Sequence, residues 1–343
     1  MEIRPYMPAD AARWDALMAA SPEATFCHLS DWQAVVERVW GHAPESLCAV
    51  ENGELVGALP LFLVAGRLFG RRLISTPNAV YGGVVARSDA VREALLAAAV
   101  ARARQLAVEY LELREIGGAA APGFLPEELY VGFACSLPAE EAARWAQLPR
   151  DVRRMIRQGE KHGLTAVAGR EELLDEFYGV YAASVRNLGT PVFPKRLFAE
   201  LLAAFPGSSD LLVIRQGSRP AGAVLSFYFR ETVYPYYGGA HRAFYRAGVN
   251  NFMYWALMNH AARRGCRRFD FGRSKRGTGA CEFKRGWGMR ETPLAYKYFL
   301  VRSRQAPNLN PLNPKYRLLV ETWKRLPLSL TKWIGPRIVR NFP

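Results

Sequence analysis

The sequence predicts an α/β chain built from two tandem units. The chain has 343 residues, more than one hydrophobic core usually organises, and 50% of them are hydrophobic. Apolar segments with strand and helix patterning occur twice in the same order along the chain. A helical stretch rich in basic residues separates the two series. The sequence therefore predicts a duplicated unit with mixed sheets flanked by helices.

The first series begins with a helix within Thr25 to Trp40, where apolar residues recur at helical spacing. Two strands follow, Leu47 to Val50 and Leu55 to Val64, joined across Asn52-Gly53, a strong hairpin signal. The remaining elements are expected as a strand around Leu73 and Ile74, a helix from Val91 to Leu106 and a strand from Val108 to Glu115.

The second series has the same order. Its elements are expected as strands at Leu211 to Ile214, Ala221 to Phe229 and Val233 to Tyr237, a helix from Asn251 to Arg264 and a strand at Phe269. Aligning the halves places Tyr81-Gly82-Gly83 opposite Tyr237-Gly238-Gly239. Between the halves, LPRDVRRMIRQGEKHGL predicts a helix with basic residues three or four apart.

Charge and cysteine usage limit the class of protein. A formal charge of +15 predicts attraction to polyanions, whether nucleic acid, phosphorylated precursors or an anionic membrane face. The five cysteines are scattered without a CxxC pair, which favours reduced thiols in a cytosol and gives no metal site. The N-terminal stretch lacks an apolar signal region, and Leu55 to Ala65 is too short to span a membrane. We expect a cytoplasmic protein.

The segment Arg268 to Gly288, RFDFGRSKRGTGACEFKRGWG, has the composition of a binding loop. It begins as a strand, and we expect it to break at Gly272 into a glycine-rich basic loop. Glycines allow backbone amides to approach a ligand, and cations beside aromatic rings suit phosphates and bases. The alternative is a solvated basic turn whose aromatics pack in the core.

These patterns resemble a known family. The repeated order, together with VRRMIRQGEKHGL, SVRNLGTPVFP at Ser184 to Pro194 and the FK motif at Phe283-Lys284, resembles the FemABX family of peptidoglycan aminoacyltransferases. The closing WKRLPLSLTKWIGPRIVRNFP adds a resemblance to the FemAB-related branch found with PEP-CTERM/exosortase and exopolysaccharide loci. The long coiled-coil insertion of some members, their tRNA-binding arm, is missing from this pattern.

The resemblance implies two tandem GNAT-like acyltransferase domains. We expect the first at 1–147 and the second, with the FK motif, at 148–291. Residues 292–343 would form a strand, within LAYKYFLV, and a basic helical tail that returns to the first domain, as family members close their two units. It also implies transfer of an activated acyl or aminoacyl group to an amine of a cell-envelope, peptidoglycan or exopolysaccharide precursor. We expect the protein to be a monomer.

Two site roles follow from the matched motifs. By resemblance, Lys284 lies where donor and acceptor meet, with Phe283 preceding it in the same motif. A lysine there can stabilise the oxyanion and the leaving group's charge during acyl transfer. Arg186 resembles the family arginine that grips an acceptor phosphate, a task suited to its forked donors. The alternatives are a surface lysine and an arginine in a domain-interface ion pair.

Other candidates come from the residues themselves. Asp270 ends a strand beside the basic segment and is a weak candidate for the general base, or a partner of a neighbouring arginine. Tyr234 and Tyr236 are expected on one strand face and Tyr237 on the other, lining a cleft or packing in the core. Further substrate-binding candidates are Arg273, Lys275 and Trp287.

One predicted turn bears on the identity of the acyl donor. Acetyltransferases of this fold hold the coenzyme A pyrophosphate at a glycine-rich turn that opens a helix. The stretch HRAFYRAGVNN keeps Arg242, Arg246 and Gly248 but lacks that spacing. We expect no tightly bound cofactor, and aminoacyl-tRNA or acyl-CoA as co-substrate. The alternative function is a non-catalytic protein that binds a polyanion or a partner of an exopolysaccharide or protein-sorting locus.

The tail predicts a contact with membrane. From Val301 to Pro343 there are nine Lys or Arg against Glu321 alone, interleaved with leucines, isoleucines and two tryptophans. This composition is typical of a helix lying in an anionic lipid interface, so we expect peripheral attachment to the inner face of the membrane. The alternative is that these helices pack on the first domain as ordinary core.

Overall fold

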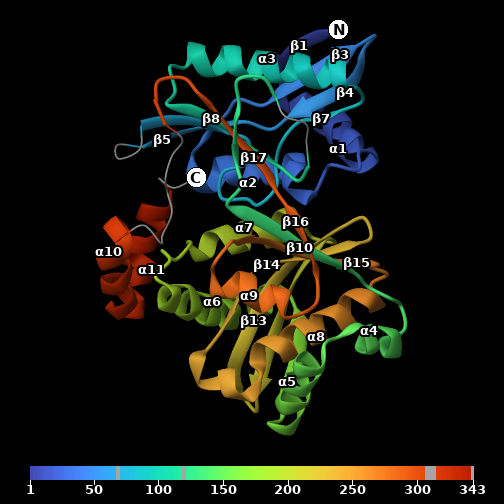
Figure 1. The fold of residues 1–343 in the computed structure, drawn as a ribbon, viewed down its shortest axis with the longest axis vertical. Coiled ribbons are helices and arrows are strands. Elements are labelled where there is room, and N and C mark those ends of the chain that lie inside the picture. The colour runs from blue at the N-terminus through green and yellow to red at the C-terminus, as the bar shows by residue number, and fades with distance from the viewer. Residues whose placement is uncertain (67–69, 118–120, 306–313, 341–343) are drawn as a thin grey trace. The chain divides into compact units, whose positions relative to one another are not determined.

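The computed structural model describes residues 1–66, 70–117, 121–305 and 314–340. The chain divides into two compact units (Figure 1). The first comprises Met1–Val131, Pro293–Asn308 and Arg340–Pro343, and the second Gly132–Thr292 and Leu309–Val339. Short 3-10 helices lie at Pro8–Asp10, Phe26–His28, Glu171–Leu173 and Arg242–Ala247.

The described residues of the first unit form two sheets and three α-helices. Its elements are β1 (Glu2–Pro5), α1 (Ala11–Ala20), α2 (Ser30–Trp40), β2 (Ala43–Pro44), β3 (Leu47–Glu51), β4 (Glu54–Leu59), β5 (Phe62–Gly66), β6 (Gly70–Ile74), β7 (Val85–Ala86), α3 (Asp89–Gln105), β8 (Tyr110–Glu115), β9 (Leu125–Glu127) and β17 (Ala295–Leu300). The strand orders are β1-β3-β4-β7 and β2-β5-β6-β8-β17-β9. The alanine-rich α3 buries Leu95 and Ala99 in the core beside β3 and β4.

The predicted hairpin is confirmed, but its second strand is divided. Asn52 and Gly53 both have positive φ, 51° and 83°, as a two-residue hairpin turn requires, and β3 pairs antiparallel with β4. The apolar run after the turn does not form one strand. It is interrupted at Pro60, and β4 and β5 belong to different sheets, because proline cannot donate a hydrogen bond to a ladder.

The second unit is built on one seven-stranded sheet of order β11-β12-β13-β14-β15-β10-β16. Its elements are β10 (Tyr130–Ser136), α4 (Glu141–Gln147), α5 (Arg150–Lys161), β11 (Leu164–Gly169), α6 (Leu174–Leu188), α7 (Lys195–Ala204), β12 (Ser209–Gln216), β13 (Arg219–Phe229), β14 (Thr232–Ala240), α8 (Val249–Arg263), β15 (Arg268–Lys275), α9 (Gly279–Arg285), β16 (Arg290–Pro293), α10 (Pro314–Arg325) and α11 (Leu328–Val339). The basic helix expected between the halves is α5.

Helices cover both faces of this sheet, as the ribbon of the second unit shows (Figure 1). A Cβ on Gly239 of β14 would meet Ser184 of α6, whereas one on Gly222 of β13 would meet Val249 of α8. Gly222 pairs with Ala240, the residue after Gly239. Because successive residues of a strand point to opposite faces, α6 and α8 lie on opposite sides of the sheet.

Two expectations about the chain's organisation need correction. Tyr81-Gly82-Gly83 lies in an irregular segment after β6, while Tyr237-Gly238-Gly239 lies inside β14, so the two motifs are not equivalent. The basic segment is also less open than expected, because β15 continues through Gly272, at φ +69°, to Lys275. After a short turn the chain forms α9, which carries the FK motif.

The C-terminal segment divides between the units. The expected strand is β17, which pairs antiparallel with β8 of the first unit over Ala295↔Glu115 to Leu300↔Tyr110. We expected the helical tail to follow it, yet α10 and α11 pack against α6 of the second unit. Trp323 accounts for part of this placement, since its Nε1 donates to the carbonyl oxygen of Thr190 at 3.0 Å. No helix in the described ranges is long and apolar enough to cross a bilayer.

Candidate active site

The candidate site lies where β14 and β15 separate. These strands pair in parallel only at Thr232↔Arg268 and Val233↔Phe269. β14 then continues to Ala240 and β15 to Lys275 without further pairing between them. Side chains that follow the separation can therefore face a ligand rather than a neighbouring strand.

Lys284 lies beside the far end of β15. Thr278 caps the N-terminus of α9 by accepting the Cys281 N–H, at 3.4 Å, and α9 then presents Lys284 towards the strand. The Lys284 Nζ donates to the carbonyl oxygens of Gly272, at 3.2 Å, and Arg273, at 2.9 Å. It also lies 5.6 Å from the centre of the Phe271 ring, within the range of a cation–π contact.

Lys284 is an ammonium with little charge compensation. Burial lowers its pKa to about 8, and Asp270 opposes that shift while Arg273 adds to it. In the part of the chain that the structure describes, no carboxylate lies within 4 Å of the Nζ, whose hydrogen bonds go to neutral carbonyls. A desolvated cation with a perturbed pKa is a functional-site signal, because an anionic ligand or a developing oxyanion would supply the missing charge.

Asp270 has a partner of its own. Its side chain is 8% exposed, and its Oδ1 accepts the Gly272 N–H at 2.8 Å. This contact fixes the turn that Gly272 makes with positive φ. Asp270 is close enough to raise the pKa of Lys284, so the structure brings these two candidates together. Arg273 and Lys275 lie half-buried on the same strand.

Aromatic rings form the wall beside Lys284. Phe283 and Trp287 pack with Phe271, at ring-centre distances of 6.3 and 5.7 Å. Trp287 is 3% exposed, and its Nε1 has no hydrogen-bond partner among the described residues. Both aromatics therefore serve packing first, and a contact of Trp287 with substrate stays a prediction.

Sequence reasoning missed Tyr254. It lies on α8, its ring centre is 4.4 Å from that of Phe271, and burial raises its pKa to about 12. The only signal in the sequence was its helical spacing within α8, which also fits ordinary core.

The three tyrosines of β14 do not alternate as predicted. Leu225 pairs with Tyr237 and Ser226 with Pro235, so Tyr236 is the extra residue of a β-bulge. The bulge brings the Tyr236 and Tyr237 rings into edge contact at 4.9 Å. Tyr237 joins Phe198 of α7, at 5.2 Å, on the side of the sheet opposite α8. Tyr234 is buried.

Arg186 forms hydrogen bonds with the C-terminal tail. Its Nη1 donates to the carbonyl oxygens of Lys324 and Leu326, both at 3.2 Å, at the C-terminal end of α10. A guanidinium there satisfies carbonyls that have no partner within the helix. Its buried Nε has no hydrogen-bond partner within the described chain. The expected phosphate contact stays a prediction, and the ion pair at a domain interface is replaced by this helix cap.

The turn before α8 is covered by α5. Gly248, at φ +77°, is the N-cap of α8 and follows the short helix Arg242–Ala247. A Cβ built on Gly248 would lie 2.2 Å from the carbonyl oxygen of Met155 in α5. Backbone atoms of α5 therefore occupy space beside the helix start that would hold a pyrophosphate in an acetyl-CoA site.

A polar network lies at the other end of α8. Asp210 accepts from the Tyr228 hydroxyl at 2.9 Å and contacts the His260 Nε2 at 2.7 Å. His260 also lines a cavity of about 440 Å³ together with Glu160, Trp255, Asn259 and Arg263. Sequence reasoning could not find this network, because Asp210 and His260 are 50 positions apart.

Comparisons with known proteins agree with this geometry. A family model described as "Acetyltransferase (GNAT) domain" matches residues 146–285, which contain the divergent strands and Lys284. No curated protein matches the sequence.

Several solved structures share the fold. FemX matches with a TM-score of 0.66 at 14% identity, covering 93% of this chain and 100% of its own. L-PGS from Bacillus licheniformis matches at 0.58 and 11% identity, covering 94% and 99%. A tandem GNAT protein from the clavulanic acid biosynthesis pathway matches at 0.53 and 14%, covering 90% and 99%. The predicted fold class, two tandem GNAT-like domains, is confirmed.

Proposed function

We propose that the protein is an N-acyltransferase that transfers an activated acyl or aminoacyl group to an amine of a cell-envelope, peptidoglycan or exopolysaccharide precursor. The observation that supports it most directly is Lys284, a desolvated cation beside the separating strands of an acetyltransferase-type domain. FemX, among the structures of the same fold, supports the envelope class of acceptor. The PEP-CTERM and exopolysaccharide association rests on the sequence resemblance alone.

The proposed reaction is a single displacement through a tetrahedral intermediate. The acceptor amine forms the new C–N bond with the donor carbonyl, and the ester or thioester bond to the donor breaks. Lys284 would stabilise the negative charge on the carbonyl oxygen and on the leaving group. The amine's proton would pass to Asp270 or to solvent, and Arg273 and Lys275 would hold anionic parts of the substrates.

The packing at α8 supports a preference between the two donors. Because α5 lies against Gly248, an acyl-CoA would have to place its pyrophosphate differently from the usual helix-start site. This favours a donor of another shape, an aminoacyl-tRNA, with acyl-CoA as the second possibility. We propose a monomer located in the cytoplasm, with neither donor held tightly.

The test compares Lys284→Met with Lys195→Met. Lys195 is an exposed lysine that pairs with Asp175. Purified protein is incubated with acyl-CoA or charged tRNA and an amine-bearing envelope precursor fraction, and products are measured by mass spectrometry. We expect Lys284→Met to lower kcat roughly 100- to 1000-fold, the usual loss for one oxyanion donor, and Lys195→Met to leave it unchanged. In the wild type, activity should fall as the pH rises through about 8, where Lys284 loses its proton.

Two outcomes would contradict the proposal. Unchanged turnover by Lys284→Met would place the chemistry elsewhere. Salt-sensitive binding of the precursor without any product would favour the non-catalytic, polyanion-binding alternative suggested by the charge of +15.

A further inference from the structure

The helices α10 and α11 have an inner face that is fully engaged. Trp323 is buried and hydrogen-bonded to Thr190, and Gly189 packs against Val320. On α11, a Cβ at Gly335 would meet the Val192 backbone at 2.6 Å, so that helix lies in backbone contact with the segment after α6. These contacts fix the orientation of both helices within the second unit.

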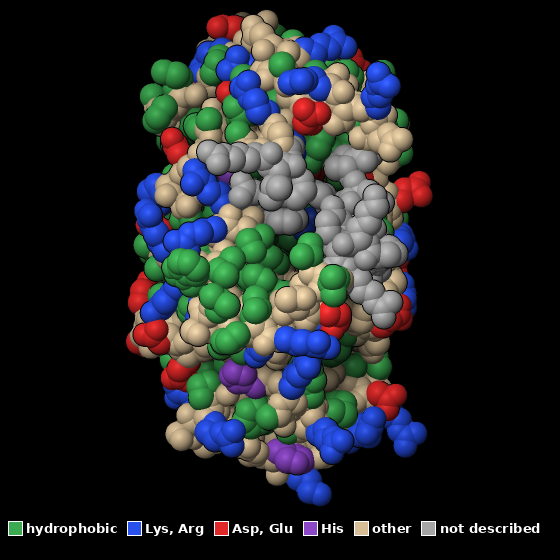
Figure 2. Space-filling view, turned by 90° about the vertical axis from the view of Figure 1, so that its left-hand side faces the viewer, with side chains coloured by type: hydrophobic (Ala, Val, Ile, Leu, Met, Phe, Trp, Pro, Cys, Tyr) green, Lys and Arg blue, Asp and Glu red, His purple; other side chains and the backbone are tan. Residues whose placement is uncertain are grey.

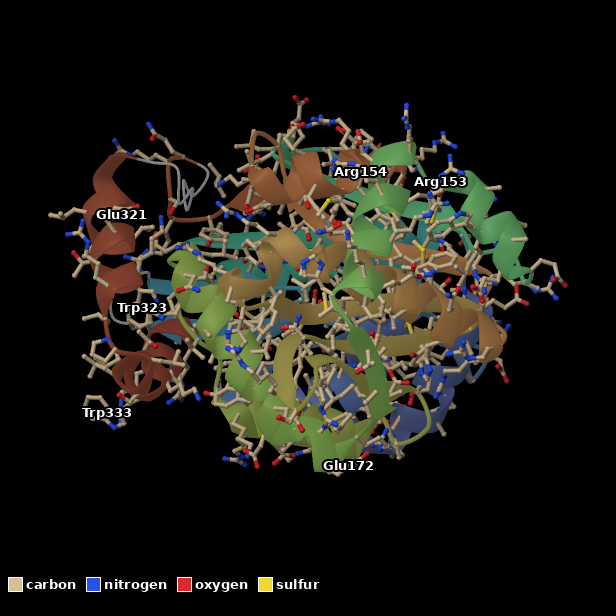
Figure 3. All side chains as sticks on the ribbon, turned by 90° about the horizontal axis from the view of Figure 1, so that it is seen from below. Arg153, Arg154, Glu172, Glu321, Trp323 and Trp333 are labelled. Carbon is tan, nitrogen blue, oxygen red and sulfur yellow. The ribbon has the colours of Figure 1, made fainter. Side chains whose placement is uncertain are left out.

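Their outer face carries large apolar side chains in solvent. Leu318 and Leu319 are 77% and 66% exposed, and Trp333 is 63% exposed. Figure 2 shows a hydrophobic patch over these helices, flanked by Lys and Arg side chains. Figure 3 shows Trp333 at the outer edge of the pair, while Trp323 points toward the body of the unit. Packing within the second unit therefore accounts for a tryptophan at position 323, but not for the exposed tryptophan at position 333.

The charges along these two helices are almost all positive. From Leu318 to Arg340 the cations are Lys324, Arg325, Lys332, Arg337 and Arg340, against Glu321 alone. The Arg337 guanidinium lies 4.5 Å from the centre of the Trp333 ring and donates to the Trp333 carbonyl oxygen at 2.8 Å. Tryptophan rings and cationic side chains are both favoured at the depth of the lipid headgroups. An exposed tryptophan next to an arginine therefore suits that region of a bilayer.

We propose that this outer face of α10 and α11 docks the protein on an anionic lipid bilayer. Leu318, Leu319 and Trp333 would enter the headgroup boundary, and the surrounding cations would contact lipid phosphates. A second copy of the chain is a poorer occupant, because a two-fold interface would set the same cations opposite one another. The inference does not depend on Lys284 and holds even if the protein is not an enzyme.

The experiment is vesicle flotation of the full-length chain with phosphatidylcholine vesicles, with or without phosphatidylglycerol. Wild type should float only with the anionic vesicles, and less at high salt. The double variant Leu319→Ser/Trp333→Ala should bind at least tenfold more weakly, and Arg325→Gln about fivefold, since a basic residue near an anionic leaflet contributes about 1 kcal/mol. Tyr245→Ala, at a 42% exposed aromatic outside the patch, is the matched control and should float as wild type.

Each of the four positions is exposed, so all variants should keep the wild-type melting temperature. Equal flotation of wild type and the double variant, or none by either, would overturn the proposal. Concentration-dependent dimers in ultracentrifugation that the double variant abolishes would overturn it too, by assigning the face to a second copy.

Discussion

Each unit contains a short parallel ladder between two strands, but the charged side chains beyond the ladder differ between the units. In the first unit β6 pairs with β8 only at Leu73↔Leu111 and Ile74↔Glu112, as β14 pairs with β15 in the second. Beyond the first ladder, buried charges occur in pairs: Arg114 with Glu112 at 2.7 Å and Lys297 with Glu115 at 2.6 Å. Beyond the second ladder, the Lys284 Nζ donates to two backbone carbonyls, lies near the Phe271 ring and makes no ion pair within 4 Å in the described part of the chain.

This difference separates a structural junction from a candidate functional one. Compensated buried charges hold their neighbours in place, and removing one partner is costly. A half-buried cation that makes no ion pair is destabilised by desolvation, so its presence suggests a task outside folding. Among the described residues, the unpaired cation beyond the ladder therefore points to a candidate site in the second unit.

The largest expected effect comes from ending the chain at Arg290. This removes β17, which supplies Lys297 and pairs antiparallel with β8 along its whole length. The first unit should then lose cooperative unfolding, because β8 is left with an open edge and Glu115 without one of its cations. Hydrogen exchange of β8 amides provides the measurement.

A chain ending after residue 305 keeps β17 and is the control for that truncation. Its β8 amides should remain protected. Full protection in the shorter chain, or independent folding of residues 1–150, would show that β17 is dispensable for the first unit.

A smaller effect is expected from Lys297→Met. The change keeps an apolar stem of similar length but removes one of the two cations at Glu115, the other being Arg92. We expect a loss of about 3–5 kcal/mol in the free energy of unfolding, as for other broken buried pairs. Lys195→Met, at an exposed pair, should cost less than about 1 kcal/mol. Urea denaturation of both variants measures the two losses in unfolding free energy. Equal losses would show that the buried pair at Glu115 is no more important for stability than the exposed pair.

The smallest effect concerns the pH dependence of stability. The pKa of Lys284 is about 8 in the fold, against 10.5 without the fold. Between these values the unfolded chain binds more protons, so this lysine makes stability rise with pH. At pH 7 its charged form costs at most roughly 3 kcal/mol. Lys284→Met should therefore gain stability relative to wild type at pH 7 and lose that advantage by pH 10.

Denaturation midpoints at several pH values between 7 and 10 provide the check. The quantity to compare at each pH is the difference in stability between the variant and the wild type, because the other lysines contribute equally to both proteins. A difference that does not change with pH would mean that Lys284 is solvated like a surface lysine, and its candidacy would weaken.

Local patterns predicted much of the fold. Periodicity located α3, α8 and most strands of both units, and Asn52-Gly53 fixed a hairpin through the backbone conformations that those two residues allow. What local pattern could not show was which sheet a strand joins. Pro60 divides one apolar run between two sheets, a result that depends on contacts made elsewhere in the chain.

The candidate site was predictable only in part. Phe283 and Lys284 were proposed from the resemblance of their motif, and Asp270 from its position at the end of a strand, and the structure places Asp270 close to Lys284. The bulge at Tyr236 reverses one side chain and depends on the register with β13, which no single strand encodes. Arg186 was assigned to a ligand, whereas its partners lie about 140 positions away on a tail whose packing site the sequence leaves open.

The position of β17 also fixes an order of events during synthesis. The strand β17, which pairs with β8 in the first unit, leaves the ribosome after Gly132–Thr292, the segment that carries most of the second unit. Until then β8 lacks that neighbour, although Met1–Val131 of its own unit has long been translated. Domains usually fold as units from the N-terminus, and unpaired strand edges promote aggregation. This nascent chain must therefore keep an incomplete sheet from self-association for most of its translation, which predicts dependence on chaperones that bind early.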